Sequence, residues 1–188
     1  MQALMHTYFV ETPLAYTGDA LRSHWIYNSF DLLGDAVVAY CGRCHVELSE
    51  MVDLADVHEQ ASIYSENMLH FIIEHFQTSL EVMVLRQRLL TAQIKDALTD
   101  LTGKSFRRDG DDIYEGEYKL SVSIATVSPV SGLMHLGLNI SSQNTPVPTR
   151  GLADYGIDPA VFAQRILQTY AAEIQNMRQA VCKVRAVS

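Results

Sequence analysis

The residues with the clearest chemical potential lie in the middle of the chain. Asp112 precedes a turn, and Lys119 then lies near the start of a segment, 118–127, in which apolar and polar residues alternate. Such alternation predicts a β-strand with one apolar and one polar face. Lys119 would share the polar face with Ser121 and Ser123, where an ammonium above small side chains has room to contact a carboxylate, phosphate or adenylate. The alternative interpretation is a solvated lysine that protects a sheet edge.

A second group is the sequence CGRCH at residues 41–45, which has the C-x-x-C-H spacing of a haem-attachment motif. A zinc site would need further ligands, and Cys182 is the one other cysteine. Gly42 and Arg43 suit a two-residue hairpin turn that begins with glycine. We therefore interpret the motif as two cysteines flanking a turn.

Two further groups suggest metal ligands by residue type. His70, Glu74 and His75 have the spacing H-x-x-x-E-H, which matches no zinc-protease motif. On a strand, His70 and Glu74 would share one face and His75 would take the other. Asp111 and Asp112 could hold a divalent cation or form a solvated turn. We predict no metal site.

Composition limits the classes of protein that the chain can represent. Its 188 residues, 48% of them hydrophobic and 19% charged, predict one folded domain spanning residues 1–188. The net charge of −8 argues against a nucleic-acid partner, and no apolar run is long enough to span a membrane. We expect a cytoplasmic protein, because no export signal is visible, with reduced cysteines. Sheet edges also favour self-association as a homo-oligomer.

Periodicity and capping signals predict the elements that position these residues. We expect a strand at 5–10, a helix from 17 or 19 to 33, strands at 35–41 and 44–48 joined by a hairpin turn, a strand at 67–76, a helix at 79–102, two short strands within 105–114, strands at 118–127 and 133–140, and a helix at 158–183. This order predicts an α+β fold: a single domain with a central, largely antiparallel sheet packed with about three main helices.

The middle of the chain resembles the core of the biotin and lipoate protein ligases. The resemblance rests on DDI at 111–113, KLSVSIA at 119–125 and HLGL at 135–138. The whole chain, in phrases such as MVDLADV, VLRQRLL and KLSVSIATVSPVS, is similar to an uncharacterised prokaryotic domain-of-unknown-function family grouped structurally with these ligases. The resemblance implies a biotin/lipoate ligase-like fold.

The resemblance also implies site residues. Lys119 would be the catalytic lysine that contacts the acyl carboxylate and the adenylate, and Asp112 would help to hold nucleotide or magnesium. The other implied ligand-binding residues are Ser121, Ser123, His135, Gly137 and His70. ATP with magnesium would be the implied cofactors.

Three functional hypotheses follow. The first is a ligase or acyltransferase that binds a small carboxylate, acyl or acyl-nucleotide ligand around Lys119. The second is a non-catalytic binding or regulatory module, because residues 51–56 are acidic where the ligases carry an Arg- and Gly-rich loop, and Val122 replaces a glycine. The third is a metal-dependent activity that uses His70, His135 or the two aspartates at 111 and 112.

Overall fold

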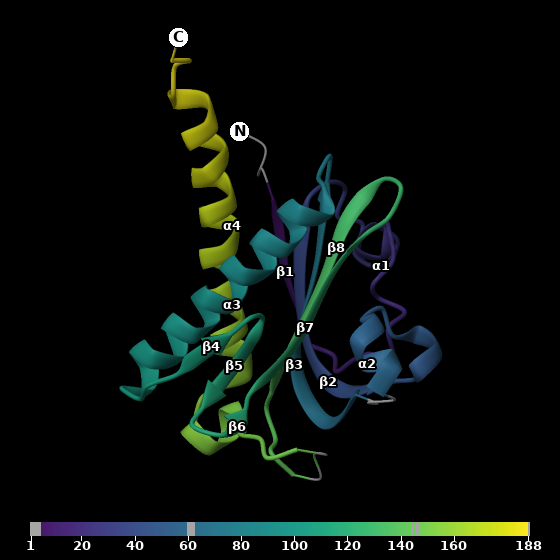
Figure 1. The fold of residues 1–188 in the computed structure, drawn as a ribbon, viewed down its shortest axis with the longest axis vertical. Helices are drawn as coiled ribbons and strands as arrows, with labels where there is room; N and C mark the ends of the chain where they lie inside the picture. The colour runs from purple at the N-terminus through teal and green to yellow at the C-terminus, as the bar shows by residue number, and fades with distance from the viewer. Residues whose placement is uncertain (1–4, 60–62, 144, 146, 188) are drawn as a thin grey trace.

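A mixed five-stranded sheet with two long helices on one face forms the centre of the molecule (Figure 1). The computed structural model describes residues 5–59, 63–143, 145 and 147–187. The strand order is β1-β2-β3-β8-β7; β1 pairs parallel to β2, and the other neighbours are antiparallel. The predicted α+β class with a largely antiparallel sheet is therefore confirmed.

The described elements have the following bounds. The main sheet contains β1 (His6–Val10), β2 (Ala36–Val46), β3 (Ile63–Phe76), β7 (Ser121–Val127) and β8 (Ser131–Asn139). A second, three-stranded sheet contains β4 (Arg107–Asp109), β5 (Asp112–Glu115) and β6 (Tyr118–Lys119). The α-helices are α1 (Trp25–Phe30), α2 (Leu54–Glu59), α3 (Leu80–Thr102) and α4 (Pro159–Lys183), with 3-10 turns at η1 (Leu48–Glu50) and η2 (Leu152–Tyr155).

Both long helices begin at the expected capping residues, and α3 also ends at one. Ser79 accepts a hydrogen bond from the backbone of Val82 at the start of α3, and Gly103 ends that helix at a φ of 67°. Asp158 caps α4 by accepting two backbone hydrogen bonds, and proline occupies the first helical position. These predictions are confirmed because side-chain capping and positive φ are local requirements that a sequence displays directly.

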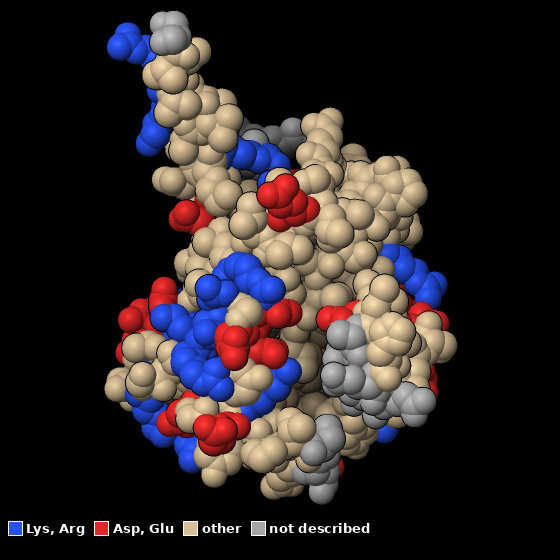
Figure 2. Space-filling view, in the orientation of Figure 1, with Lys and Arg blue, Asp and Glu red and all other residues tan. Residues whose placement is uncertain are grey.

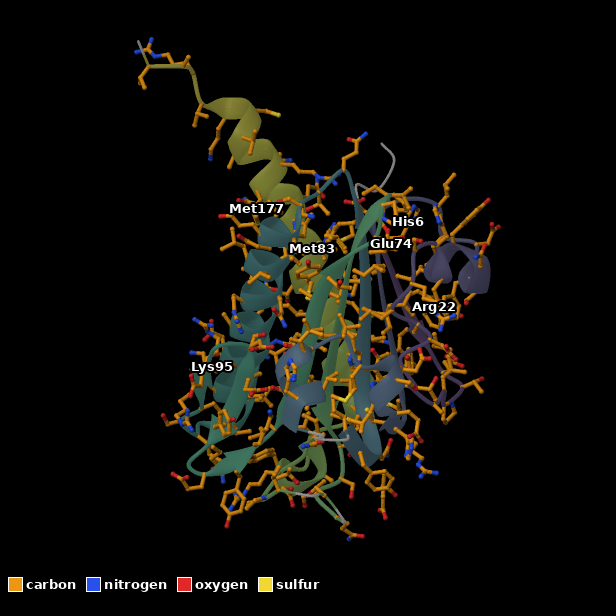
Figure 3. The ribbon with its side chains drawn as sticks, turned by 45° about the vertical axis from the view of Figure 1, so that its right-hand side comes forward. His6, Arg22, Glu74, Met83, Lys95 and Met177 are labelled. Atoms are coloured by element: carbon orange, nitrogen blue, oxygen red, sulfur yellow. The ribbon has the colours of Figure 1, made fainter. Side chains whose placement is uncertain are left out.

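The sheet has a separate apolar cluster on each face. On the helix side, Phe71 and Ile73 of β3 pack in the cluster that also includes Leu90 of α3 and Phe162 of α4. Met83 of α3 also points toward the sheet (Figure 3). On the opposite face of the sheet, Tyr16, Val38 and Ile72 belong to a smaller apolar cluster. This face is covered by α1, α2 and the segments that connect them. This thinner layer leaves room for a pocket.

Two predictions in the N-terminal quarter are wrong. The expected helix from 17 or 19 to 33 is reduced to α1, and the residues before it run as turns. The expected hairpin at Gly42 and Arg43 is absent, because β2 is one strand of 11 residues with a register shift between Gly42 and Cys44. The cysteines therefore lie within a bulged strand.

The C-terminal part of α4 extends beyond the sheet (Figure 1). Met177 lies on this extension, and it is partly exposed together with Val181 and Val184 (Figure 3). Among the described residues, no helix has the length and apolar character needed to cross a membrane.

Candidate functional site

Two buried histidines face each other on neighbouring strands. His70 of β3 and His135 of β8 lie on the sheet face opposite α3 and α4, and Nδ1 of His70 is 3.0 Å from Nε2 of His135. The other ring nitrogen of His70 donates to the carbonyl oxygen of Gly42 at 3.1 Å. The sheet register thus brings together two imidazoles that are 65 residues apart in the sequence.

Tyr16 covers this imidazole pair. Its ring stacks on His135 with centroids 3.7 Å apart and planes 15° apart, and it lies 5.4 Å from the ring of His70. The segment that carries Tyr16 is held over β2 by backbone hydrogen bonds, from Leu14 N to Cys41 O and from Tyr16 N to Arg43 O. This segment passes so close that a Cβ atom on Gly42 would lie 1.9 Å from the carbonyl oxygen of Leu14. Glycine at position 42 therefore lets the tyrosine reach the histidines.

A small pocket of about 40 Å³ opens beside the stacked rings. Its lining residues come from the Tyr16 segment, the end of β2, the connection at 50–53, and strands β3, β7 and β8: Tyr16, Leu21, Val46, Glu50, Met51, Val52, Asp53, Ile63, Val122, Ser123, Ile124 and His135. One water molecule needs roughly 10–15 Å³ of cavity volume, so the pocket has room for about three groups of that size. It therefore suits the end of a small molecule.

The charged side chains that line the pocket are acidic. Glu50 and Asp53 contribute carboxylates, and the described lining contains no lysine or arginine. Glu50 is 3.3 Å from Arg22, which is exposed on the outer side. The charged groups of the described lining are therefore hydrogen-bond acceptors, and most of the other lining side chains are apolar.

Burial keeps both imidazoles neutral. It lowers the pKa of His70 to about 4, although the hydrogen bond to Gly42 acts in the opposite direction. Burial also lowers the pKa of His135 well below its usual value, and the neighbouring His70 adds to this effect. At neutral pH the pair therefore carries no charge, and each ring has one N–H and one bare nitrogen.

Lys119 lies outside the lining of this pocket, at the end of β6. Its Nζ atom is 2.8 Å from Oδ2 of Asp112, and both side chains are partly exposed. Burial raises the pKa of the Asp112 carboxyl, although the Lys119 ammonium acts in the opposite direction. The sequence analysis did not anticipate this ion pair, since the two residues are seven positions apart and meet only because β5 and β6 are antiparallel neighbours.

The surface around Lys119 carries charges of both signs. Figure 2 shows Lys and Arg side chains interleaved with Asp and Glu over the small sheet and α3. Lys104 pairs with Glu115 and Arg107 with Asp109 on this surface. This face therefore does not form a patch of one charge sign.

The two predicted serines serve the helix side of the sheet. Ser121 accepts a hydrogen bond from the backbone of Ile113, and Ser123 donates to Oδ2 of Asp111 at 2.9 Å. The amide of Gln87 on α3 donates to both Asp111 and Ser123. These side chains join α3 and the small sheet to β7.

Of the predicted site residues, His135 and Ser123 line the pocket, whereas the others lie outside its lining. His70 and His135 lie on one sheet face, and the hydroxyls of Ser121 and Ser123 are bonded on the other. Gly137 faces the histidine side, where Met68 and Val122 cover it: a Cβ atom there would lie 2.9 Å from Met68 and 3.4 Å from Val122. Lys119 and Asp112 form a separate pair.

The metal and cysteine candidates have other contacts. Glu74 accepts from Ser131 and from the backbone of His24, whereas His75 contacts Asp35 on the opposite face, as the strand alternation predicts. In the part of the chain that the structure describes, no three His, Cys, Asp or Glu side chains are grouped to hold a metal ion. Cys44 is buried, and burial raises the pKa of its thiol to about 12, so it is not a reactive thiolate at neutral pH.

Comparison with known proteins places the chain in a family. A family model described as a domain of unknown function, DUF366, matches residues 5–185. The chain belongs to the DUF366 family. A solved protein of unknown function from Pyrococcus horikoshi is 39% identical, with a TM-score of 0.93 over 98% of this chain and 100% of that one.

The fold of this DUF366 chain is also similar to that of biotin and lipoate protein ligases. A biotin protein ligase mutant from Aquifex aeolicus in complex with biotin has a TM-score of 0.63 and 13% identity, over 93% of this chain and 72% of that one. A putative lipoate protein ligase from T. acidophilum with bound lipoic acid has a TM-score of 0.57 and 16% identity, over 91% of this chain and 86% of that one. At these sequence identities the similarity shows the fold alone, and it confirms the predicted biotin/lipoate ligase-like fold.

The sequence analysis missed several members of the pocket. Tyr16 lies in an irregular segment and Glu50 in the short 3-10 turn η1, where periodicity gives no signal, and Asp53 was noted only for its charge. Gly42 gave the one usable signal, since a glycine inside a strand indicates close approach of another backbone.

Proposed function

We propose that this DUF366 protein binds a small molecule with a carboxylate or acyl group, with the body of the ligand in the pocket beside His135 and the carboxyl or acyl end toward Lys119. The observation that carries the proposal is the pocket itself, on the face of the sheet where Tyr16 and His135 stack. The shared fold with proteins solved with biotin and with lipoic acid supports the ligand class.

Lys119, at the end of β6, is close enough in the chain to the pocket-lining part of β7 for one ligand to reach both places. Val122 lines the pocket, and Lys119 precedes it by three residues. At about 3.3 Å per residue, the two Cα atoms lie about 10 Å apart. Lys119 would then supply a positive charge at the carboxyl end, although it would have to share that charge with Asp112.

The described lining does not fit a nucleotide triphosphate. Phosphates require cations or a cradle of backbone N–H groups, whereas the lining carboxylates are Glu50 and Asp53 without a lysine or arginine. We therefore derive no adenylation step for this chain.

The first candidate reaction is acyl transfer from a thioester. An acceptor amine would add to the acyl carbon, the C–S bond would break, and the thiol would leave with the proton given up by the amine. The Lys119 ammonium would stabilise the negative charge that develops on the acyl oxygen.

The second candidate is a binding or regulatory module without turnover. The acidic pocket wall favours it, and so does the Asp112 partner of Lys119. Both candidates require the same ligand site and differ in the role of Lys119.

Calorimetric titration with biotin, lipoate and their coenzyme A thioesters tests the shared site, and release of free thiol tests turnover. Lys119→Ala should weaken binding of at least one of these probes about tenfold or more, since a charged partner is lost. Lys104→Ala is the matched control, because Lys104 is also paired with a carboxylate on the small sheet. Absence of binding by all the probes would refute the proposal, and binding without thiol release would favour the second candidate.

A further inference from the structure

The protonation of the imidazole pair follows from its hydrogen bonds. The acceptor at one end is the carbonyl oxygen of Gly42, which has no proton to give. Nε2 of His70 must therefore carry its ring proton. Because His70 is neutral at neutral pH, its Nδ1 atom is then bare.

The same reasoning fixes His135. The bare Nδ1 of His70 can only accept, so Nε2 of His135 must donate across the 3.0 Å contact. His135 is also neutral, and its one ring proton is used in this bond. Nδ1 of His135 is therefore a bare nitrogen with a lone pair available.

This nitrogen has access to the pocket. Among the described residues, His70 alone hydrogen-bonds to the ring of His135. Nδ1 of His135 is not among the fully enclosed polar atoms that lack a partner in the described part of the chain. His135 lines the pocket, which gives the lone pair a cavity to face.

The other lining side chains add acceptors. Glu50 and Asp53 carry carboxylates, and that of Glu50 lies 3.3 Å from Arg22. The hydroxyl of Ser123 is already donated to Asp111. A ligand that satisfies the lone pair of His135 must bring its own N–H or O–H.

We propose that the pocket beside His135 binds a head group that donates hydrogen bonds, an ammonium or a hydroxyl, whose proton points to Nδ1 of His135. The inference rests on the proposed function, because it specifies the end of the ligand opposite the carboxyl group. An anionic head does not suit this position, since it would face the lone pair of Nδ1.

Measurement of the tautomers tests the premise without any variant or ligand. In ¹⁵N-labelled full-length protein at pH 7, long-range ¹H–¹⁵N correlation spectra should show both rings protonated at Nε2 alone. Protonation of His135 at Nδ1, or a doubly protonated ring, would overturn the inference.

A ligand series with one carboxylate tail and different heads tests the preference. Hexanoate, 6-hydroxyhexanoate, 6-aminohexanoate and adipate offer a methyl, a hydroxyl, an ammonium and a second carboxylate. Calorimetry should give the hydroxyl and ammonium compounds about tenfold tighter Kd values than hexanoate, with adipate weakest. Equal or tighter binding of hexanoate or adipate would overturn the inference but leave the proposed function standing. Failure of all four compounds and of the biotin and lipoate probes would refute the proposed function and the inference with it.

His135→Phe links the preference to the nitrogen. The new ring can still stack on Tyr16, while the lone pair is lost, so hexanoate and 6-aminohexanoate should bind within about twofold of each other. His45→Phe is the matched control, because His45 lies on β2 with an exposed side chain paired to Glu47. A preference that persists in His135→Phe would contradict the assignment, and if that variant does not fold, the tautomer measurement on the wild type still decides it.

Discussion

The Nε2 atom of His75 lies 2.9 Å from the hydroxyl of Tyr170, and this contact joins the central strand β3 to helix α4. Oδ2 of Asp35 accepts from Nδ1 of His75 at 2.9 Å, so Nε2 is bare and the tyrosine donates. Arg178 of α4 also pairs with Asp35. The chain Asp35–His75–Tyr170 is thus a buried polar connection within the apolar layer between sheet and helices.

Tyr170→Phe should lower the free energy of unfolding by about 1–3 kcal/mol, because it leaves the buried Nε2 of His75 without a partner. Urea denaturation followed by circular dichroism measures the change. Tyr27→Phe, at a partly exposed position on α1, serves as the control and should stay within about 0.5 kcal/mol. A loss in Tyr170→Phe no larger than in the control would show that the contact contributes nothing to stability.

Stability should fall as the pH is lowered from 6.5 to 4. The pKa values of His70, His135 and His75 are all lowered in the folded protein, chiefly by burial. The unfolded chain therefore binds more protons in this range, and the free energy of unfolding rises with pH. His70 alone, with a folded pKa of about 4, should account for roughly 2 kcal/mol of loss at pH 5.

Urea denaturation at pH 7.5, 6 and 5 measures this dependence. His70→Gln should give a flatter profile, whereas His45→Gln at an exposed position should keep the wild-type slope. An unfolding free energy that stays constant down to pH 5 would contradict the neutral, buried imidazole pair.

Gly42→Ala should destabilise the protein by about 2 kcal/mol or more and displace Tyr16. The added methyl would meet the backbone of Leu14, which cannot rotate away. Gly137→Ala is the milder comparison, since its nearest contact is the flexible end of Met68. Thermal unfolding, with near-ultraviolet circular dichroism to follow the tyrosine environment, distinguishes them; equal losses at both positions would refute the close approach.

Ser123→Ala should cost about 1 kcal/mol of stability and leave ligand affinity within twofold. Ser123 is one of the residues that line the pocket, but its hydroxyl is already hydrogen-bonded to Asp111 and Gln87 and is therefore not available to a ligand. The titrations described for the ligand series measure the affinity. A tenfold loss of ligand affinity in Ser123→Ala would instead show that Ser123 contacts the ligand, as the resemblance to the ligases implies.

Local signals predicted the fold well where the structure depends on local chemistry. Asp158 and Pro159 mark the start of α4, and Ser79 and Gly103 bracket α3, because capping involves residues within one turn. Alternation likewise identified β7 and β8. The wrong hairpin at Gly42 has a nonlocal cause: the glycine is compatible with a turn or with the close approach of another backbone, and residues 41–45 do not show that Leu14 crosses over them.

The candidate site was predicted in part, because it depends on strand register. Alternation places Val122 and Ile124 on the face opposite Ser121 and Ser123, yet it does not say which face His135 shares. The structure pairs His135 with Ile124, and so separates the histidine from the serines. Only the spatial arrangement of β3, β8 and the Tyr16 segment reveals the imidazole pair.

The two sides of the pocket differ in local stability. The side formed by the sheet belongs chiefly to β7 and β8, whereas the Tyr16 segment on the other side is held over β2 by a few backbone hydrogen bonds. Segments of this kind open locally at a lower free energy than the whole domain. The amides of Tyr16 and His45, which make these bonds, should exchange with deuterium sooner than those of β3. A ligand could therefore reach His135 without unfolding of the sheet, through local opening of the segment that carries Tyr16. A ligand bound beneath this segment would in turn stabilise its closed state and slow the exchange of these amides.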